Sequence, residues 1–362
     1  MGGPVATFVS SRLGGTDGVS IEAAKWMHAL ESLGFTTRRV AGELPAAVRP
    51  DDVVVPWLAL DPPPGSSAPG VDALTELLDE GDLTVVENIC SLPLNLGASR
   101  AVAATLGRTR SRVVLHHHDL SWQRPQTAAI TDVPPRPAGA LHVAINASSR
   151  DELAQRGIDA VQITNAFDVD SPPGDRATTR AALGFADDEI VVLQPARAIP
   201  RKNIPAALAY VDALAALVAP TPVRFWLTGP AEDGYATVLD ELLATVRVPV
   251  TLGLGPSPAD AYAAADVVVF PSTVEGFGNP VIESVIARRP LIIGHYPVLV
   301  EILAHGFELF RVDEPEAMAK WLADPDPELL DRNFERARSQ YSSADLPRRI
   351  DAAFRKHGWV SW

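Results

Sequence analysis

Short apolar runs that alternate with helix-forming segments constrain the fold of this chain more than any other feature. In the first half, the apolar runs lie at 5–10, 36–40, 53–56, 83–87, 113–116, 141–145 and 161–164. The segments of helical periodicity between them lie at 19–33, 71–79, 100–106 and 149–156. Short apolar strands that alternate with helices are typical of parallel sheets covered by helices on both faces. The pattern therefore predicts a doubly wound α/β fold.

The alternation breaks at 165–174 and then starts again. Strands are predicted in the second half at 190–193, 223–227, 250–252, 267–270, 291–293 and 308–311. The segment 327–362 has the pattern of a closing pair of helices. A chain of 362 residues is long enough for two hydrophobic cores. We therefore expect two Rossmann-like domains, 1–168 and 169–340, followed by a C-terminal helix at 341–362.

Composition favours a soluble enzyme of the cytoplasm. Hydrophobic residues make up 47% of the chain and charged residues 21%, and no apolar run is long enough to span a bilayer. The first residues lead directly into a predicted strand, so we expect no secretory signal. Cys90 is the only cysteine, which excludes an internal disulfide and a cysteine-cluster metal site. The formal net charge of −14 argues against nonspecific binding of nucleic acid.

A glycine-rich loop follows the predicted strand at 267–270. It runs from Glu275 to Glu283 with the sequence Glu-Gly-Phe-Gly-Asn-Pro-Val-Ile-Glu, and a helix is predicted to begin near Pro280. Free backbone N–H groups beside the positive end of a helix can hold phosphate or sugar oxygens. Glu275 lies at the mouth of this loop and Glu283 about one turn into the helix, so both could reach one ligand. A surface loop with a helix-capping acid is the alternative.

A basic loop occupies the equivalent place after the strand at 190–193. It contains Arg197 and Lys202, and a helix is predicted from about Ile204. Two cations beside a helix N-terminus are well placed to converge on an anion. An ordinary basic loop is the alternative.

These two motifs together resemble those of the retaining glycosyltransferases of the group 1 type, also called glycosyltransferase family 4. The resemblance implies the GT-B fold, in which two doubly wound domains face a central cleft. The first domain would bind the acceptor and the second a nucleotide-diphosphate sugar, without a metal or another cofactor. The segment 341–362 would cross back to the first domain. Trp359 and Trp362 could anchor that contact, with core packing as the alternative.

The resemblance also implies roles for individual residues. Arg197 and Lys202 would hold the donor diphosphate, Glu275 would orient the transferred sugar and Glu283 the ribose. The loop residues that would bind the donor are Gly276, Phe277, Gly278 and Asn279.

The first strand is followed by a second glycine-rich loop, which resembles the family's first loop near the donor phosphates and the acceptor. Its glycines are Gly14, Gly15 and Gly18. The inserted Thr16-Asp17 departs from the commonest form and leaves open which glycine meets phosphate. Asp17 is a candidate on the acceptor side, and a plain strand–helix turn is the alternative.

Three consecutive histidines, His116, His117 and His118, end the strand at 113–116. They suggest zinc, but adjacent residues of an extended strand point to opposite faces, so all three rarely bind one ion. We therefore predict no metal site. By resemblance, His118 would contact the donor sugar, and Asp119 and Asn88 would line the acceptor side of the cleft.

Two charged groups invite other interpretations. The arginines at 100, 108, 110 and 112 could bind a phosphorylated acceptor or an anionic membrane, although a solvated helix end is favoured. Asp168 and Asp170 have the metal-binding spacing of GT-A enzymes, but they lie in the expected linker.

The sequence thus predicts a retaining hexosyltransferase that uses a UDP- or GDP-sugar and an unidentified hydroxyl acceptor. A catalytically silent sugar-nucleotide-binding protein, and an epimerase or phosphorylase relative on the same fold, are the alternatives. A phosphorylase would need a lysine-bound pyridoxal cofactor. Peripheral membrane contact has no support in the sequence.

Overall fold

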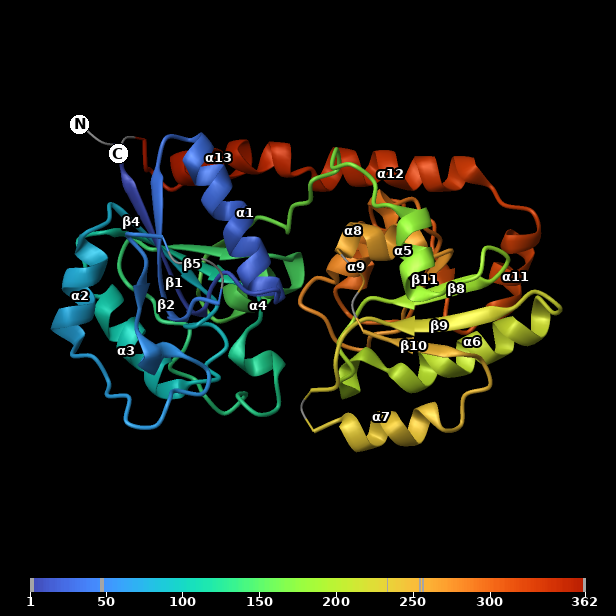
Figure 1. Ribbon diagram of the computed structural model, residues 1–362. Coiled ribbons are helices and arrows are strands. Elements are labelled where there is room, and N and C mark those ends of the chain that lie inside the picture. The colour runs from blue at the N-terminus through green and yellow to red at the C-terminus, as the bar shows by residue number, and fades with distance from the viewer. Residues whose placement is uncertain (1–2, 46–48, 233, 254, 256, 361–362) are drawn as a thin grey trace. The chain divides into compact units, whose positions relative to one another are not determined.

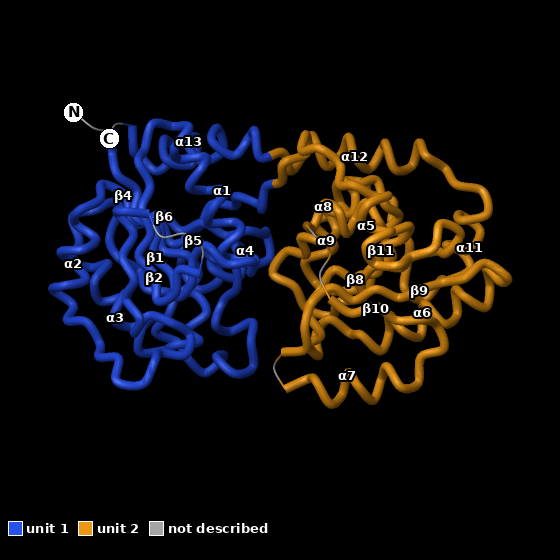
Figure 2. Tube along the Cα trace, viewed as in Figure 1, with its two compact units in different colours: residues 1–166, 343–362 blue, residues 167–342 orange. Residues whose placement is uncertain are grey.

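The computed structural model describes the chain apart from residues 1–2, 46–48, 233, 254, 256 and 361–362. The described residues form two compact units, shown in different colours in Figure 2. Unit 1 comprises residues 1–166 and 343–362, and unit 2 comprises residues 167–342. The sequence placed the junction at 168 and the start of the last segment at 341, within two residues of these divisions.

Unit 1 contains a seven-stranded sheet in the order β3-β2-β1-β4-β5-β6-β7, and each neighbouring pair is parallel. Its strands are β1 (Val5–Arg12), β2 (Thr36–Glu43), β3 (Val53–Val54), β4 (Leu83–Glu87), β5 (Arg112–His117), β6 (Leu141–Ala144) and β7 (Ala160–Gln162). Its helices are α1 (Gly18–Ser32), α2 (Val71–Asp79), α3 (Leu96–Leu106), α4 (Ala147–Gln155) and α13 (Leu346–Lys356) (Figure 1).

Two apolar clusters cover the two faces of this sheet. On one face, α1 and α13 bury residues such as Trp26 and Phe354 against the strands. On the other face, α2 and α3 bury residues such as Leu78 and Val102. Trp359 packs on Phe354 with ring centroids 5.4 Å apart, so it belongs to the core of unit 1. Trp362 lies outside the described residues.

Unit 2 contains a six-stranded parallel sheet in the order β10-β9-β8-β11-β12-β13. Its strands are β8 (Ile190–Gln194), β9 (Val223–Leu227), β10 (Val250–Leu252), β11 (Val267–Phe270), β12 (Leu291–Ile293) and β13 (Phe310–Arg311). Its helices are α5 (Arg176–Leu183), α6 (Ile204–Leu217), α7 (Ala236–Leu243), α8 (Pro258–Ala264), α9 (Asn279–Ile286), α10 (Leu299–Leu303), α11 (Pro315–Ala323) and α12 (Pro327–Tyr341).

The two sheets share a topological feature that places ligands. In unit 1 the strand order reverses between β1 and β4, and in unit 2 it reverses between β8 and β11. Loops that leave two such strands go to opposite faces of the sheet, which opens a crevice at their carboxyl ends. The glycine-rich and basic loops identified in the sequence follow β1, β8 and β11, so they lie at these two points.

The strand and helix pattern is largely as predicted. Strands β4, β9, β10, β11 and β12 have the predicted bounds. The helix predicted at 100–106 begins earlier, at Leu96, because the Asn95 side chain accepts a hydrogen bond from the Ala98 N–H and caps it. The strand predicted at 53–56 ends at Val54, and Pro56 begins a short 3-10 helix. Among the described residues, no helix has both the length and the apolar character needed to cross a bilayer.

Candidate active site

The loop between β11 and α9 has a backbone that only glycine tolerates at one point. Gly278 has φ of 100°, in the left-handed region, and caps the N-terminus of α9. A Cβ at this position would lie 2.2 Å from the hydroxyl oxygen of Tyr296. That hydroxyl donates a 3.2 Å hydrogen bond to the carbonyl of Phe277. Tyr296 and the missing side chain of Gly278 therefore fix the path of the loop at the start of the helix.

Glu275 lies between two cations. Its Oε1 is 2.5 Å from Nζ of Lys202, and its Oε2 is 2.9 Å from a guanidinium nitrogen of Arg201. Burial acts to raise the pKa of Glu275, but Lys202 and Arg201 outweigh it, so the pKa lies below its ordinary value. The carboxylate therefore stays charged at neutral pH. The sequence missed Arg201, although its place next to Lys202 in the same basic loop was a signal.

Arg197 and Lys202, which the sequence predicts to converge on an anion, have different carboxylate partners in unit 2. Arg197 is exposed and pairs with Glu232 at 2.5 Å, whereas Lys202 is buried under Glu275. The ammonium of Lys202 also lies 4.7 Å from the ring centre of Phe270. Burial lowers the pKa of Lys202 and outweighs the attraction of Glu275.

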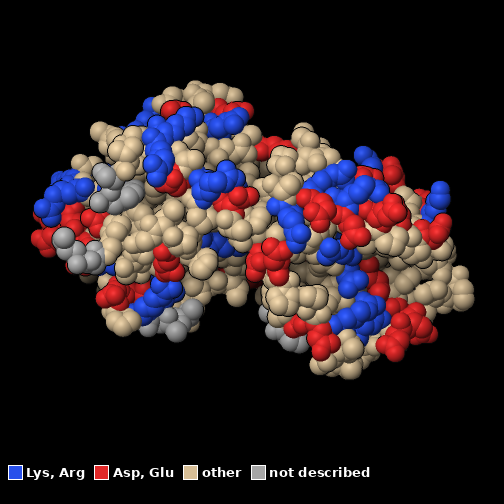
Figure 3. Space-filling view, turned by 90° about the horizontal axis from the view of Figure 1, so that it is seen from above, with Lys and Arg blue, Asp and Glu red and all other residues tan. Residues whose placement is uncertain are grey.

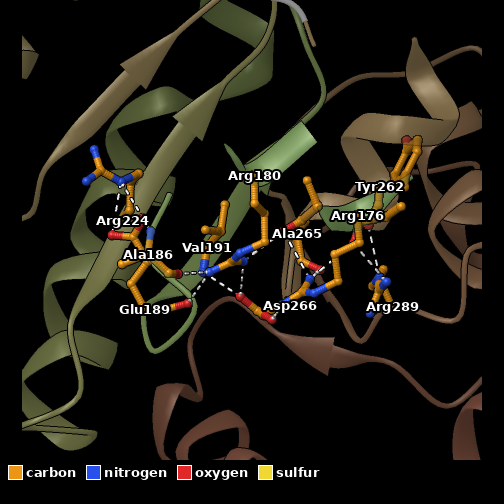
Figure 4. A network of polar contacts seen from close by, with 12 residues as sticks. Arg176, Arg180, Ala186, Glu189, Val191, Arg224, Tyr262, Ala265, Asp266 and Arg289 are labelled. Carbon is orange, nitrogen blue, oxygen red and sulfur yellow. Dashed lines mark hydrogen bonds and ion pairs between the residues drawn. The ribbon is translucent and has the colours of Figure 1, made fainter. Parts of the chain in front are cut away.

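Glu283 accepts a 2.7 Å hydrogen bond from the hydroxyl of Tyr262, which is buried at the end of α8. The carbonyls that end α8 are held by arginine side chains: Arg289 donates to Tyr262 O and Ala263 O, both at 2.9 Å. Arg176 donates to the carbonyl of Ala265 at 3.0 Å, and Figure 4 shows both arginines beside this helix end. Cations at a helix C-terminus are stabilising. The sequence missed Tyr262, because nothing in its local pattern separates it from a core residue.

The arginine network extends to the edge of β8. Asp266 accepts from Arg176 at 2.5 Å, from Arg180 at 3.1 Å and from the N–H of Val191 at 2.8 Å (Figure 4). These contacts tie α5 and the start of β11 to the start of β8. Helix α8 and the strands that carry both loops are thereby held in one framework.

A hollow of about 400 Å³ lies at the carboxyl ends of β9 and β10 in unit 2. Residues that line it include Thr228, Pro230, Leu239 and Leu252. It adjoins the loop of Arg197, because a Cβ on Gly229, another lining residue, would lie 2.5 Å from the Cα of Arg197. The sequence gave this segment no role.

In unit 1, the loop after β1 is held by a helix cap. Asp17 accepts hydrogen bonds from the N–H of Ser20 at 3.1 Å and from its hydroxyl at 2.7 Å. This explains why α1 begins at Gly18. Gly14 has φ of 77°, whereas a Cβ on Gly15 would approach the Asp17 carboxylate at 3.0 Å. Asp17, predicted on the acceptor side, therefore has a structural task in this loop.

The histidines at the end of β5 divide between two sides, as an extended strand requires. Oε2 of Glu87 is hydrogen-bonded to Nδ1 of His116 at 2.9 Å and to Nε2 of His118 at 2.8 Å. His117 faces the other way and contacts Ser91 at 2.5 Å and His142 at 2.9 Å. The sequence-based prediction ended a strand at Glu87 but did not pair its carboxylate with the histidines. A carboxylate that ends an apolar strand beside a strand ending in histidines was the available signal.

The turn after these histidines is held by Asn88. Its side-chain oxygen accepts hydrogen bonds from the N–H groups of His118 at 3.2 Å and Asp119 at 3.1 Å. The carboxylate of Asp119 pairs with Arg124 at 2.6 Å. Asn88 and Asp119 were predicted on the acceptor side, and the structure shows that they also shape the loop that carries His118.

Glu87, His116 and His118 could in principle hold a metal ion, since one ligand atom of each lies within 4.8 Å of the others. The Glu87 oxygen lies 2.9 and 2.8 Å from the two histidine nitrogens, which are hydrogen-bond distances. Ligand atoms at about 2.0–2.2 Å from a tetrahedral zinc ion would be roughly 3.3 Å apart. The group is therefore packed as a hydrogen-bonded cluster.

The arginines at 100–112 do not form a free basic surface. Arg100 pairs with Asp132 at 2.7 Å, Arg108 with Asp72 at 2.9 Å and Arg110 with Asp79 at 3.2 Å. Arg112 lies 5.8 Å from the ring centre of Trp359. On the face shown in Figure 3, basic and acidic side chains are likewise interspersed. Asp170 of the GT-A-like spacing pairs with Arg338 at 2.5 Å.

Comparison with known protein families identifies the domain that carries the unit 2 loops. Residues 175–340 match the family model of the glycosyl transferases group 1. The chain contains a group 1 glycosyltransferase domain. The matched region runs from the start of α5 into α12 and includes both loops of the unit 2 site.

Relatives with similar sequences are glycosyltransferases as well. The mannosylglucosylglycerate synthase of Petrotoga mobilis is 26% identical over an alignment that covers 83% of this chain and 85% of the relative. The enzyme of the same name from Thermotoga maritima is 28% identical and covers 74% and 75%. The D-inositol 3-phosphate glycosyltransferase of Mycobacterium tuberculosis is 30% identical over 51% of this chain and 41% of the relative. Residues 175–340 of this chain thus share their family with glycosyltransferases.

Solved structures with the same fold cover both units of this chain. Anabaena HepE, in complex with UDP and glucose, has a TM-score of 0.76 at 18% identity, over 98% of this chain and 100% of its own. Sucrose-phosphate synthase from Thermosynechococcus elongatus has a TM-score of 0.71 at 16% identity, over 99% and 100%. The predicted GT-B fold class, with two doubly wound domains, is confirmed.

Proposed function

We propose that this glycosyltransferase moves a hexose from a UDP- or GDP-sugar to a hydroxyl acceptor, with retention of the anomeric configuration and without a metal ion. The observation that carries the proposal is the buried ion pair of Lys202 with Glu275 at the switch point of unit 2, beside the glycine-rich N-terminus of α9. Burying charged groups costs free energy, so a buried ion pair indicates a structural or a catalytic role.

The diphosphate of the donor would take the cations of the basic loop. Lys202 supplies a fixed positive charge, and the N–H groups at residues 276–279 supply the positive end of α9. Arg197 is exposed and paired with Glu232 at the surface, where an ion pair contributes little. It can therefore exchange this partner for a phosphate at small cost and form a stronger charge-assisted hydrogen bond.

The nucleoside would lie between Glu283 and the hollow beside β10. Glu283, held by Tyr262, has the charged oxygens that ribose hydroxyls require as acceptors. The hollow carries the apolar side chains of Leu239 and Leu252, which suit the faces of a flat base.

Retention would follow from attack on the same face of the sugar. The acceptor oxygen forms a bond to the anomeric carbon as the bond from that carbon to the phosphate oxygen breaks, and the acceptor's proton passes to the departing phosphate. The protein then contributes mainly positioning and electrostatic stabilisation. Glu275, kept ionised by Lys202 and Arg201, would stabilise the positive charge that develops on the sugar.

The acceptor is proposed from the relatives that match most of this chain. Two of them are mannosylglucosylglycerate synthases. We therefore place a mannosyl donor and glucosylglycerate first among the substrates to test. D-inositol 3-phosphate comes second, because its glycosyltransferase matches only half of the chain.

The experiment begins with thermal-shift screening of UDP- and GDP-hexoses, with ADP-glucose as a control for base selectivity. Donors that stabilise the protein are then incubated with each acceptor, and the anomeric configuration of the product is read by NMR. A product with the anomeric configuration of the donor supports the proposal. An inverted product, or donor binding without transfer or hydrolysis, contradicts it, and the second outcome indicates a silent sugar-nucleotide-binding protein.

A further inference from the structure

One buried carboxylate of unit 1 has no part in the mechanism above. Glu87 ends β4 with no exposed surface and accepts hydrogen bonds from two imidazoles through the same oxygen, Oε2. Its other oxygen, Oε1, is buried and has no hydrogen-bond partner in the described part of the chain. A buried carboxylate with a free oxygen is costly, which calls for a reason beyond packing.

The hydrogen bonds fix where the protons are. An ionised carboxylate can only accept, so His116 must carry a proton on Nδ1 and His118 a proton on Nε2. Burial acts to raise the pKa of Glu87, but His116 and His118 outweigh it and lower the pKa to about 2. Glu87 is therefore a charged acceptor at neutral pH.

The two histidines differ in their second nitrogen. Nε2 of His116 is buried and has no partner among the described residues, so a second proton there would be an unsatisfied donor. The ring of His116 also packs against Trp26, with ring centroids 4.4 Å apart. Nδ1 of His118 is not among the buried unpartnered atoms, and His118 retains 5% exposure. A second proton is therefore tolerated on His118 and not on His116.

We propose that Glu87 is a positioning residue that fixes the ring of His118 and holds it as an imidazolium, with Nδ1–H turned toward the ligand. The inference rests on the proposed function and on the contact between His118 and the donor sugar that the family resemblance implies. The fixed Nδ1–H would donate to a sugar hydroxyl, and the positive charge would favour the diphosphate that accumulates negative charge as the sugar leaves.

Charges around His118 agree with this assignment. Burial acts to lower the pKa of His118, but Glu87 outweighs it, and Glu22 of α1 and Asp119 add to the effect, so the pKa lies above its ordinary value. Burial lowers the pKa of His116 and of His117, so both stay neutral near pH 7. His118 is thus the member of the cluster that takes the charge.

NMR of the histidine rings tests the proton directly, without any substrate. The chain has eight histidines, and the His118→Asn variant identifies the resonances of His118. In the wild-type protein, His118 should be protonated on both nitrogens, with a titration midpoint above the ordinary value of about 6.5. In Glu87→Gln the midpoint should fall below that value. The matched control is Glu22→Gln, which removes a buried carboxylate that makes no hydrogen bond to His118 and should shift the midpoint less.

Three outcomes overturn the inference. The first is a neutral His118 in the wild-type protein at pH 6, and this readout stands even if Glu87→Gln fails to fold. The second is a midpoint in Glu87→Gln that moves no more than in Glu22→Gln. The third is stoichiometric binding of added Zn²⁺ with loss of a proton from His118, which would make the cluster a metal site.

Kinetics then separate positioning from mere stability. The kinetics use a sugar donor and an acceptor found for the wild-type enzyme. Glu87→Gln should lower kcat by about tenfold to a hundredfold, because the hydrogen-bond donor, Nδ1–H of His118, is loosened rather than removed. The alkaline limb of its pH profile should move to lower pH, while the donor KM changes little. A uniform loss of activity with an unshifted profile contradicts the inference. If the wild-type enzyme transfers no sugar at all, the proposed function fails, and the NMR titration still decides the state of His118.

Discussion

The hydroxyl of Tyr262 donates a 2.7 Å hydrogen bond to Oε2 of Glu283, and this contact joins the end of α8 to the first turns of α9. Arg289 and Arg176 donate to carbonyls at the end of α8, so the backbone that carries Tyr262 is held in place (Figure 4). Burial, followed by the charge of Glu283, raises the pKa of Tyr262, so the hydroxyl remains a donor at any pH of interest. The carboxylate of Glu283 is thereby oriented before a ligand arrives.

The first prediction concerns donor binding through this pair. Glu283→Gln should raise the donor KM by about tenfold or more, since a hydrogen bond to a charged group is worth roughly 1.5–3 kcal/mol. Tyr262→Phe should raise the donor KM less, with kcat nearly unchanged. In this variant Glu283 still contacts the sugar nucleotide, but its carboxylate is no longer oriented by the hydroxyl. Steady-state kinetics of both variants and of the double variant measure this. Strictly additive effects would show that Tyr262 does not act through Glu283.

The second prediction assigns Glu275 to the chemical step. Its charge is expected at the anomeric carbon, where positive charge develops, so it should matter more in the transition state than in the ground state. Glu275→Gln should therefore lower kcat more than it raises the donor KM. Since Lys202 would lose its partner, circular dichroism must first show a folded protein. Full kcat in a folded variant would exclude the assigned role.

Metal dependence is the subject of the third prediction. Arg197, Arg201 and Lys202 supply, near one loop, the positive charge that a divalent ion supplies in other transferases. Transfer or donor hydrolysis should therefore keep its rate in excess EDTA. Loss of activity in EDTA that Mn²⁺ or Mg²⁺ restores would reverse this assignment and redirect attention to Asp168 and Asp170.

The fourth prediction tests the glycine that starts α9. In Gly278→Ala, the new methyl group would meet Tyr296 at 2.2 Å, in addition to the strain of a left-handed backbone. Overpacking costs about 1–3 kcal/mol and the backbone about 1–2 kcal/mol more. Urea unfolding should show a loss of that size. Gly184→Ala is the matched control, because φ is 69° and no atom lies within 4 Å of its Cβ, so only the backbone cost should appear.

The fifth prediction concerns acid stability. The pKa of Glu87 is about 2 in the folded protein and about 4.5 when unperturbed, so the folded state binds fewer protons between these values. A carboxyl group with a lowered pKa adds stability above its unfolded pKa and loses it as the pH falls toward its folded pKa. The wild-type protein should lose more stability than Glu87→Gln between pH 6 and pH 3. Equal losses in urea unfolding at the two pH values would contradict the low pKa.

The unit 2 site could be located from the sequence but not assembled from it. The loops of Arg197 and Glu275 follow β8 and β11, and the structure makes these neighbouring strands at the switch point. The sequence placed Arg197 and Lys202 together, because both lie in one basic loop. It could not show that Glu232, which is 35 residues further along the chain, would pair with Arg197, or that Arg201 would join Lys202 on Glu275.

In unit 1, too, the sequence predicted local features but not the contacts between strands. Alternation along the strand correctly put His116 and His118 on one side and His117 on the other, because side-chain direction in a strand is a local property. The partner of the two histidines was beyond local reasoning: Glu87 belongs to another strand, and only the parallel pairing of β4 with β5 brings Glu87 opposite His116.

By itself, the sequence determined the order of strands and helices, the division into two doubly wound domains and the loops that carry the candidate site, because periodicity and turn chemistry act over a few residues. The tertiary structure decided which charges meet: Glu275 with Lys202 and Arg201, Glu283 with Tyr262, and Glu87 with its two histidines. These contacts join segments far apart in the chain. They depend on sheet order and burial, which set both the distances between charges and the cost of leaving a charge unpaired.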